Sequence, residues 1–282
     1  MVYLGNAFHV FVLMKKTLLA LLLPGCAYLL VGCVVYQPTQ CAAPQITGPK
    51  QAEITASSYL NGRYELAGTY SPLPHLLVRM SLGSLRDNSR DDLRTQRDST
   101  YYRGHHYDVA LGTYWPLGSQ WVVGGLGGFG QARNEAAYSG GAFLSPTRYQ
   151  FDARYNKLFG EVYGIFQAGE VVSLGAAYRV TQTNFTSLTD RGTPVDLRGM
   201  TRSEPMLFLR TRLGSGPVEN RPIQFQAAWG TSATFGYDER NRPGPYSLEA
   251  RELLQGRGYT TLGITVFPHC LFRKAQPPTD GR

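Results

Sequence analysis

The chain has 282 residues, of which 32 are Gly, 18 are Tyr and 17% are charged. Ordinary soluble domains carry about 25% charged residues, so this composition disfavours a helix bundle and suits many short strands joined by turns. The net charge of +8 does not indicate a nucleic-acid partner, because Lys and Arg are scattered and form no basic run among aromatic residues. We expect basic loops close to anionic lipid headgroups instead.

The first predicted element is a secretory signal. Two lysines at 15–16 precede an uncharged, mostly apolar run over residues 18–31, and Gly32 then precedes Cys33. The run is shorter than the ~20 apolar residues that a membrane-spanning helix needs. Residues 1–13 fit poorly ahead of such a signal, which suggests that Met14 is the true start.

The end of the run, Leu30-Val31-Gly32-Cys33, resembles the lipobox of bacterial lipoproteins. In that family the cysteine thiol receives a diacylglyceryl group, the preceding peptide is removed and the new amino group is acylated. The resemblance implies a signal peptide over 1–33 and a palmitate-type acyl anchor on Cys33. It also implies the outer membrane, because Val34 stands where an aspartate often marks retention in the inner membrane. Cleavage without lipid and an uncleaved anchor remain alternatives.

Residues 34–50 contain three prolines and predict an extended tether. Beyond them no segment convincingly predicts an amphipathic helix, whereas about ten segments have the composition of strands, and several of these alternate in the way that gives a sheet one apolar face. In residues 172–180, for example, apolar side chains occupy the even positions and Ser173 and Arg179 lie among the odd ones. The faces of 150–167 are unclear because of Lys157 and Glu161. The ten segments are 51–60, 63–71, 75–84, 101–115, 120–133, 150–167, 170–183, 204–213, 222–236 and 257–268.

The links between these segments alternate in length, with one exception at Asn61-Gly62, which predicts a two-residue hairpin. Spanning barrels have this asymmetry, with tight periplasmic turns and longer outer loops. The short links are 72–74, 116–119, 168–169 and 214–221, and the long ones are 85–100, 134–149, 184–203 and 237–256.

This pattern resembles the small outer-membrane β-barrel superfamily. The resemblance implies an all-β fold, an antiparallel up-and-down β-barrel of about eight to ten strands over 51–268, followed by a polar tail over 269–282. Short turns would face the periplasm, and the lipid anchor would place the N-terminus on that same periplasmic side. A soluble β-sandwich tethered at the periplasmic face, binding a small apolar or glycan ligand, is the alternative, since alternation alone does not place a sheet in lipid.

Several polar residues fall on the face opposite to the apolar one and are expected inside the barrel. Such residues usually pair into a salt-bridged plug, because an isolated charge there is costly. An open pore is the alternative, although so few strands leave little lumen. The candidates are Arg79, Asp108, Arg179, Arg210, Arg212, Gln224 and Gln226.

The sequence offers little catalytic chemistry, and we expect no enzyme, no cofactor and no metal site. His105 and His106 are adjacent in a predicted strand and point to opposite faces, so they cannot jointly bind a metal. The glycines of 124–130 are not followed by Lys-Ser/Thr, which argues against a nucleotide loop. A lipid-modifying enzyme using Asp108, His106 and Ser173 is a further alternative.

Two cysteines, Cys41 and Cys270, remain in the mature chain at opposite ends of the body. In a closed barrel the first and last strands are neighbours, so a disulfide between them and two separate thiols are both open. The sequence as a whole predicts a lipid-anchored outer-membrane barrel with a structural or surface-interaction role, exercised by its long outer loops.

Overall fold

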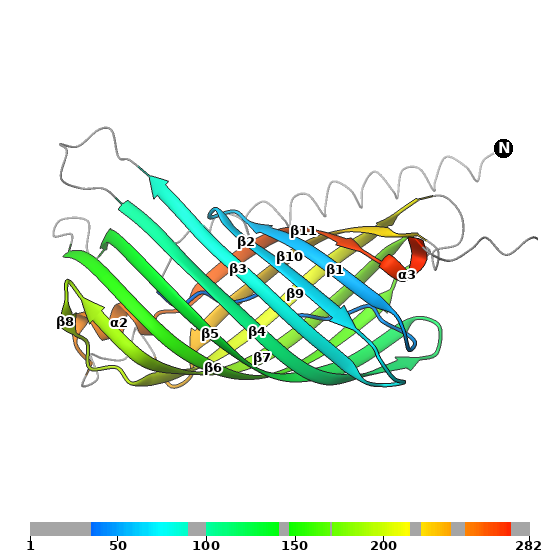
Figure 1. Cartoon of the computed structure of the whole chain (residues 1–282), viewed down its shortest axis with the longest axis horizontal. Coiled ribbons are helices and arrows are strands. Elements are labelled where there is room, and N and C mark those ends of the chain that lie inside the picture. The colour runs from blue at the N-terminus through cyan, green and yellow to red at the C-terminus, as the bar shows by residue number, and fades with distance from the viewer. Residues whose placement is uncertain are drawn as a thin grey trace, which may run out of the picture.

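The computed structural model describes residues 35–89, 100–140, 147–169, 171–214, 221–237 and 246–271. These residues build ten long antiparallel strands, and each pairs with its neighbour along the chain (Figure 1). The predicted strands are all present. Their bounds are β1 (Ala52–Tyr59), β2 (Arg63–Tyr70), β3 (Leu77–Ser89), β4 (Thr100–Leu117), β5 (Trp121–Gly140), β6 (Thr147–Gln167), β7 (Val172–Asp190), β9 (Gly199–Leu213), β10 (Ile223–Thr234) and β11 (Arg257–Val266).

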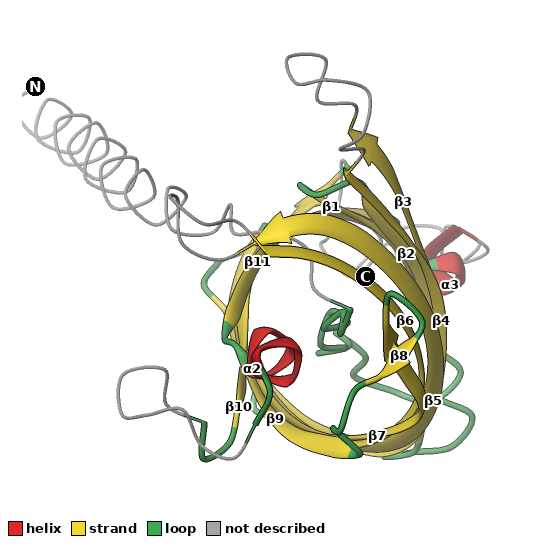
Figure 2. Ribbon diagram, turned by 90° about the vertical axis from the view of Figure 1, so that its left-hand side faces the viewer, coloured by secondary structure: helices red, strands yellow, loops and turns green. Residues whose placement is uncertain are grey.

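The sheet closes on itself. The first strand pairs with the last, from Ile54 opposite Val266 to Tyr59 opposite Thr261, and the pairing of β6 with β7 completes the ring (Figure 2). The predicted up-and-down barrel is therefore confirmed, and the alternative of a β-sandwich is wrong.

The outer face of the barrel carries an apolar band. On β6 the outward side chains Leu158 and Val162 are 62% and 61% exposed, while Lys157 and Glu161, which directly precede them in the chain, are buried inside the barrel. Seen from lipid, the even positions of 158–166 are apolar or Gly, whereas those of 150–156 are Gln, Asp, Arg and Asn. About nine to eleven tilted residues are enough to cross a bilayer. The 21-residue β6 thus crosses with one half and extends beyond the bilayer with the other.

Aromatic side chains mark both margins of this band, as they do in spanning barrels. Tyr107 and Tyr178 face outward at the margin nearer the long links, and their hydroxyls bond to the outward Gln131 and Ser203. Trp115 and Trp121, 50% and 48% exposed, face outward at the opposite margin.

The two ends of the barrel differ. Short turns close the end where α3 (Pro268–Leu271) follows β11, and the long links gather at the other end (Figure 1). The wall is lowest at β1 and β2, which have eight residues each and are joined by the tight turn 60–62, with Gly62 at φ 77°. A hairpin turn is present where Asn61-Gly62 predicts one, but it has three residues, 60–62, and not the two predicted. Gly supplies the positive φ that such a turn needs.

The long-link end also holds elements that the sequence did not predict. The two-residue β8 (Thr193–Pro194) continues the β7 hairpin, and the short helix α2 (Leu248–Leu254) lies inside the mouth of the barrel (Figure 2). Ser247 caps α2 by accepting a hydrogen bond from the amide of Ala250. A two-turn helix within a polar link gives too short an apolar period to be recognised from sequence. None of the described helices has the length and apolarity to cross a membrane.

Candidate functional site: a chain segment held in the lumen

Residues 35–46, hereafter the luminal segment, lie inside the barrel. All are buried except Gln45, which is partly exposed. The sequence predicts an extended tether for residues 34–50; the luminal segment is without regular secondary structure, and it is packed inside the barrel. An irregular segment has main-chain amides and carbonyls that no helix or sheet satisfies, so its burial requires partners in the wall.

The luminal segment runs the length of the barrel in a defined direction. The carbonyl of Val35 accepts a hydrogen bond from the side-chain amide of Asn134 at 2.6 Å, above the apolar band on β5. At the other end, the amide of Lys50 donates to the carbonyl of Ser71 at 2.7 Å, where the short turn after β2 begins. The chain thus enters at the long-link end and reaches β1 at the short-turn end. Residues 1–34, with the predicted signal peptide and Cys33, lie outside the described residues.

One buried ion pair binds the middle of the luminal segment. Arg179 on β7 bonds to Glu161 on β6 at 2.6 Å, and both side chains are at most 1% exposed. Arg179 also donates to the carbonyls of Thr39 and Gln40, each at 3.1 Å, and to the Thr39 hydroxyl.

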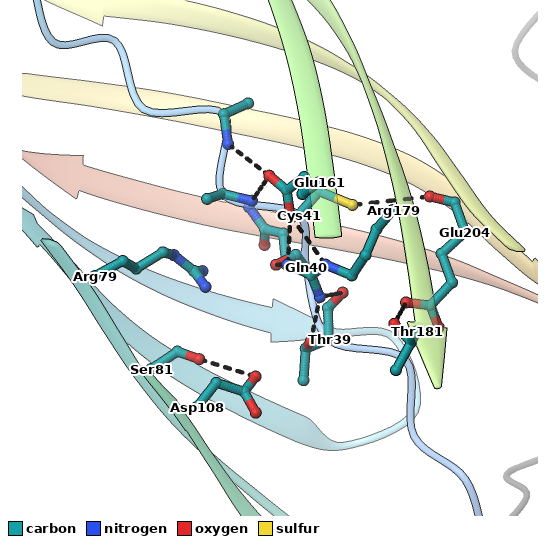
Figure 3. A network of polar contacts seen from close by, with 12 residues as sticks. Thr39, Gln40, Cys41, Arg79, Ser81, Asp108, Glu161, Arg179, Thr181 and Glu204 are labelled. Carbon is teal, nitrogen blue, oxygen red and sulfur yellow. Dashed lines mark hydrogen bonds and ion pairs between the residues drawn. The ribbon is translucent and has the colours of Figure 1, made fainter. Parts of the chain in front are cut away.

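The carboxylate of the same pair acts on the next residues. Glu161 accepts hydrogen bonds from the amides of Ala42 at 2.8 Å and Ala43 at 3.4 Å. Figure 3 shows the arginine and the glutamate approaching the segment from adjacent strands. One charged pair thus satisfies four main-chain groups, two carbonyls and two amides, that would otherwise be buried without partners.

The rest of the wall repeats this arrangement, with cations on carbonyls and carboxylates on amides. Charge-assisted bonds of this kind are about twice as strong as neutral ones, so the wall binds the main chain of the segment more than its side chains. The further contacts are Arg210 to the carbonyl of Ala43 at 2.7 Å, Arg63 to the carbonyl of Pro38, Glu65 from the amide of Gln40 at 3.2 Å, and Glu53 from the amide of Gln45 at 3.0 Å.

Near the long-link mouth the contacts are made by side chains. The hydroxyl of Tyr36 donates to Glu204 at 2.8 Å, and Glu204 also accepts from Thr181 and Ser232. Val35 and Tyr36 pack in one apolar cluster with Leu253 of α2.

Helix α2 is itself tied to the wall. Arg202 on β9 donates to the carbonyl of Gln255 at 3.2 Å and to the carbonyl of Ser232 at 2.7 Å. A cation at the C-terminal end of a helix satisfies its last carbonyls and complements its dipole. The helix and the start of the luminal segment pack together in this mouth.

The filling of the lumen is tight at mid-height. A cavity beside Cys41, lined also by Glu53 and Arg79, has a volume of only about 10 Å³. A site needs at least about 10–15 Å³ to hold one water molecule. The short-turn mouth is wider, with a polar cavity of about 500 Å³ next to Gln45, Lys50 and Arg212.

All seven residues that the sequence places inside the barrel are buried there. Arg179 and Arg210 reach the luminal segment, as does Gln224, which donates to Gln45 at 2.7 Å. The other four bind within the wall: Arg79 lies 3.6 Å from Glu65, Asp108 lies 2.8 Å from Lys157, Gln226 accepts from Arg210 at 2.5 Å, and Arg212 lies over the ring of Phe267.

Sequence reasoning missed most of the interior acids, including Glu53, Glu65, Glu161 and Glu204. The signal was present on β6, where every odd position from 149 to 165 faces inward. Lys157 and Glu161 share this face with aromatic residues, so it is neither plainly polar nor plainly apolar. An interior that mixes charge pairs with aromatic packing blurs the period-two contrast that sequence analysis depends on.

Gly124, Gly128 and Gly130 make room for interior side chains. A Cβ on Gly130 would lie 2.0 Å from Asp108 Oδ1, and one on Gly124 would lie 2.4 Å from the hydroxyl of Tyr163. Such close approach is one reason for Gly within a strand.

Of the two alternatives left open for Cys41 and Cys270, the structure has two separate buried thiols. Cys41 lies mid-lumen, with its sulfur 3.9 Å from the carbonyl of Glu204, whereas Cys270 lies in α3 beyond the end of β11. Closure of the barrel does bring β1 and β11 together, but Cys41 precedes β1 and is drawn away from that seam into the lumen.

The residues considered for lipid-modifying chemistry do not assemble. His106 and Asp108 both face inward on β4, while His105 faces outward. Asp108 is paired with Lys157, and Ser173 stands on β7 in register with Arg210 of β9, away from β4. Among the described residues, no group of three or more His, Cys, Asp or Glu could hold a metal ion.

The closed sheet, the apolar outer band with its aromatic margins, and the charged lumen define the class. This chain has the fold of an outer-membrane β-barrel, with the lipid bilayer against its outer wall. No protein-family model matches the chain, and no curated protein matches it.

Solved structures that it resembles are outer-membrane barrels of several kinds. The outer-membrane protease OmpT of Escherichia coli has 11% identity and a TM-score of 0.37, with 78% of this chain and 94% of that one covered. The translocator domain of the autotransporter NalP of Neisseria meningitidis has 10% identity and a TM-score of 0.41, covering 77% and 86%. The N-terminal β-barrel domain of Pseudomonas aeruginosa OprF has 11% identity and a TM-score of 0.28, covering 78% and 99%.

Proposed function

We propose that this chain is a lipid-anchored outer-membrane barrel, closed by its own N-terminal segment, that presents its long links to a surface or envelope partner and has no catalytic activity. The observation that carries the proposal is the luminal segment, whose main chain is bound along its length by charged residues of the wall. A barrel that served as an open channel would have no use for interior charges directed at its own backbone.

Two features support the interaction role. The strands β4–β7 have 18 to 21 residues and extend well beyond the apolar band at the long-link end. Their projecting part is rigid, paired sheet with outward polar side chains such as Arg133 and Glu135, which form an ion pair at 3.1 Å. Rigid supports for exposed loops are typical of binding surfaces.

Conductance tests the closed lumen. The full chain, refolded and inserted into planar bilayers, is expected to show no steady conductance. The double variant R179Q/R210Q is expected to conduct, because it loses the arginine hydrogen bonds to the main chain of residues 39–43. Steady conductance of the unaltered chain, at the level of the double variant, would overturn the proposal of a closed barrel.

Two further measurements test the anchor and the absence of catalysis. Mass spectrometry of the N-terminal peptide is expected to show an acyl mass on Cys33 that C33S lacks, while C33S still requires detergent for extraction. The lipid A profile of cells is expected to be the same with the unaltered chain and with D108N at equal folded amounts. A lipid A profile that changes in D108N would contradict the proposed absence of catalysis and favour a lipid-modifying enzyme.

A further inference from the structure

The luminal segment joins the two faces of the membrane. Its first described residue, Val35, is bonded to Asn134 above the apolar band, and its far end passes into β1 at the short-turn end. In outer-membrane barrels the short turns face the periplasm and the long links face outward. The chain therefore passes from the outer face to the periplasmic face through the lumen before the first strand begins.

We infer that the N-terminal end of the mature chain lies at the cell surface, so that the acyl group of Cys33 anchors the protein from the outer side of the membrane. The position of the acyl group rests on the proposed acylation of Cys33, whereas the path of the chain does not. This differs from the periplasmic N-terminus that the sequence suggested, because that expectation assumed a tether below the barrel.

The short distance from Val35 to Cys33 fixes the side from which such an anchor acts. Beyond Pro38, whose carbonyl accepts from Arg63, residues 35–37 continue inside the lumen, and Val35 is bonded to Asn134 at the long-link end. Cys33 is two residues from Val35, and an extended chain spans about 3.3–3.6 Å per residue. A reach of roughly 7 Å is far shorter than the hydrocarbon core of about 30 Å, so the acyl group would stay on the long-link side.

An outer anchor would also prevent the luminal segment from being withdrawn from the barrel. The segment is then fixed on one side by the lipid and on the other by β1, whose pairing with β2 and β11 is part of the barrel wall. Neither end can be withdrawn through the lumen without extracting acyl chains or opening the sheet. The wall contacts to residues 38–45 hold the part in between.

Site-directed labelling of intact cells tests the inference. V34C in the full chain places a thiol next to the anchor, and S119C places one in the exposed short turn after β4. A third variant, with a cysteine at position 95 of the link between β3 and β4, reports the long-link end. A membrane-impermeant maleimide is applied before and after permeabilisation, and the unaltered chain gives the background from Cys41 and Cys270, which are both buried.

The expected result is that V34C and the position-95 variant label on intact cells as fully as on permeabilised ones, while S119C labels only after permeabilisation. Labelling of V34C only after permeabilisation, with the other two unchanged, would overturn the inference and leave the barrel proposal intact. Labelling of S119C on intact cells would overturn the orientation and with it the inference. A heat-shifted band on unboiled gels, measured on the same samples, separates these outcomes from failure of the barrel to fold.

Discussion

Substitution of Arg179 by Gln removes the charged side chain that binds the middle of the luminal segment. The side chain is 1% exposed, bonds to Glu161 at 2.6 Å and donates to two main-chain carbonyls. Removing one partner of a buried ion pair costs about 3–5 kcal/mol, because the remaining charge stays buried without compensation. Hydrogen bonds from a charged donor contribute about 1.5–3 kcal/mol each, but these terms overlap and do not add in full. We expect R179Q to lower the free energy of unfolding by about 3–5 kcal/mol.

The assay is urea unfolding in detergent micelles, followed by the heat-shifted band and by tryptophan fluorescence. R154Q is the matched control, since Arg154 is on the neighbouring strand and faces outward, exposed. Substitutions at such surface positions usually change stability by less than about 0.5 kcal/mol. The two variants carry the same chemical change and differ in whether the guanidinium faces the segment.

A double-mutant cycle with E161Q identifies the source of the loss. If most of the cost comes from the unpaired Glu161 carboxylate, R179Q/E161Q will be less destabilised than the sum of the single variants, by an amount within the usual coupling range of about 0.5–3 kcal/mol. Equal stability of R179Q and R154Q would refute the reasoning, since it would mean that the arginine does not hold the segment in the lumen.

Three other sets of variants test the close packing at the glycines of β5, the position of the apolar band and the binding of α2 at the long-link end. G130A is expected to cost about 1–3 kcal/mol in urea unfolding, because its Cβ would clash with Asp108. G127A should be near neutral, because its Cβ would meet only the carbonyl of Phe159, at an ordinary contact distance of 3.8 Å. L158R, in the apolar band, is expected to cost about 2–4 kcal/mol in lipid vesicles, and N156R, two residues beyond it, about 0–1 kcal/mol; equal costs would contradict the assigned bilayer position. R202Q should expose Arg251 of α2 to trypsin in the folded protein, with the exposed R198Q as control. Unchanged resistance at Arg251 would show that α2 does not depend on Arg202.

The barrel could be predicted from the sequence because lipid imposes a simple pattern. Only the part of each strand that crosses the bilayer alternates between apolar and polar residues, so the ten spanning segments were located correctly. The same cause made several strands too short in the prediction. Once β5 and β6 leave the lipid, polar residues such as Arg133 and Arg154 occupy their outward face, and the alternation disappears although the ladder continues.

The sequence predicts that charged side chains fill the lumen, but it does not show which groups they bind. The interior position of Arg179 and Arg210 followed from the pattern, and ion pairing followed from the cost of burying charge. What the arginines bind did not follow, because their partners include the carbonyls of Thr39, Gln40 and Ala43, and a main-chain group has no sequence signature.

Binding through the main chain also explains the composition of the luminal segment. Because the wall binds its main chain, the segment itself needs few charged side chains, and residues 35–46 contain none. A stretch rich in Pro, Gln and Ala with no charge looks like a solvated tether in sequence, although the complementary charges stand on strands more than a hundred residues away, on Glu161 and Arg179. Arg210 is the inward charge that indicates an occupant, because only Ser173 and Gln226 lie opposite it on the neighbouring strands and it binds the carbonyl of Ala43. An interior Arg or Glu without an evident partner on a neighbouring strand predicts that some other stretch of polar backbone lies inside the barrel with it.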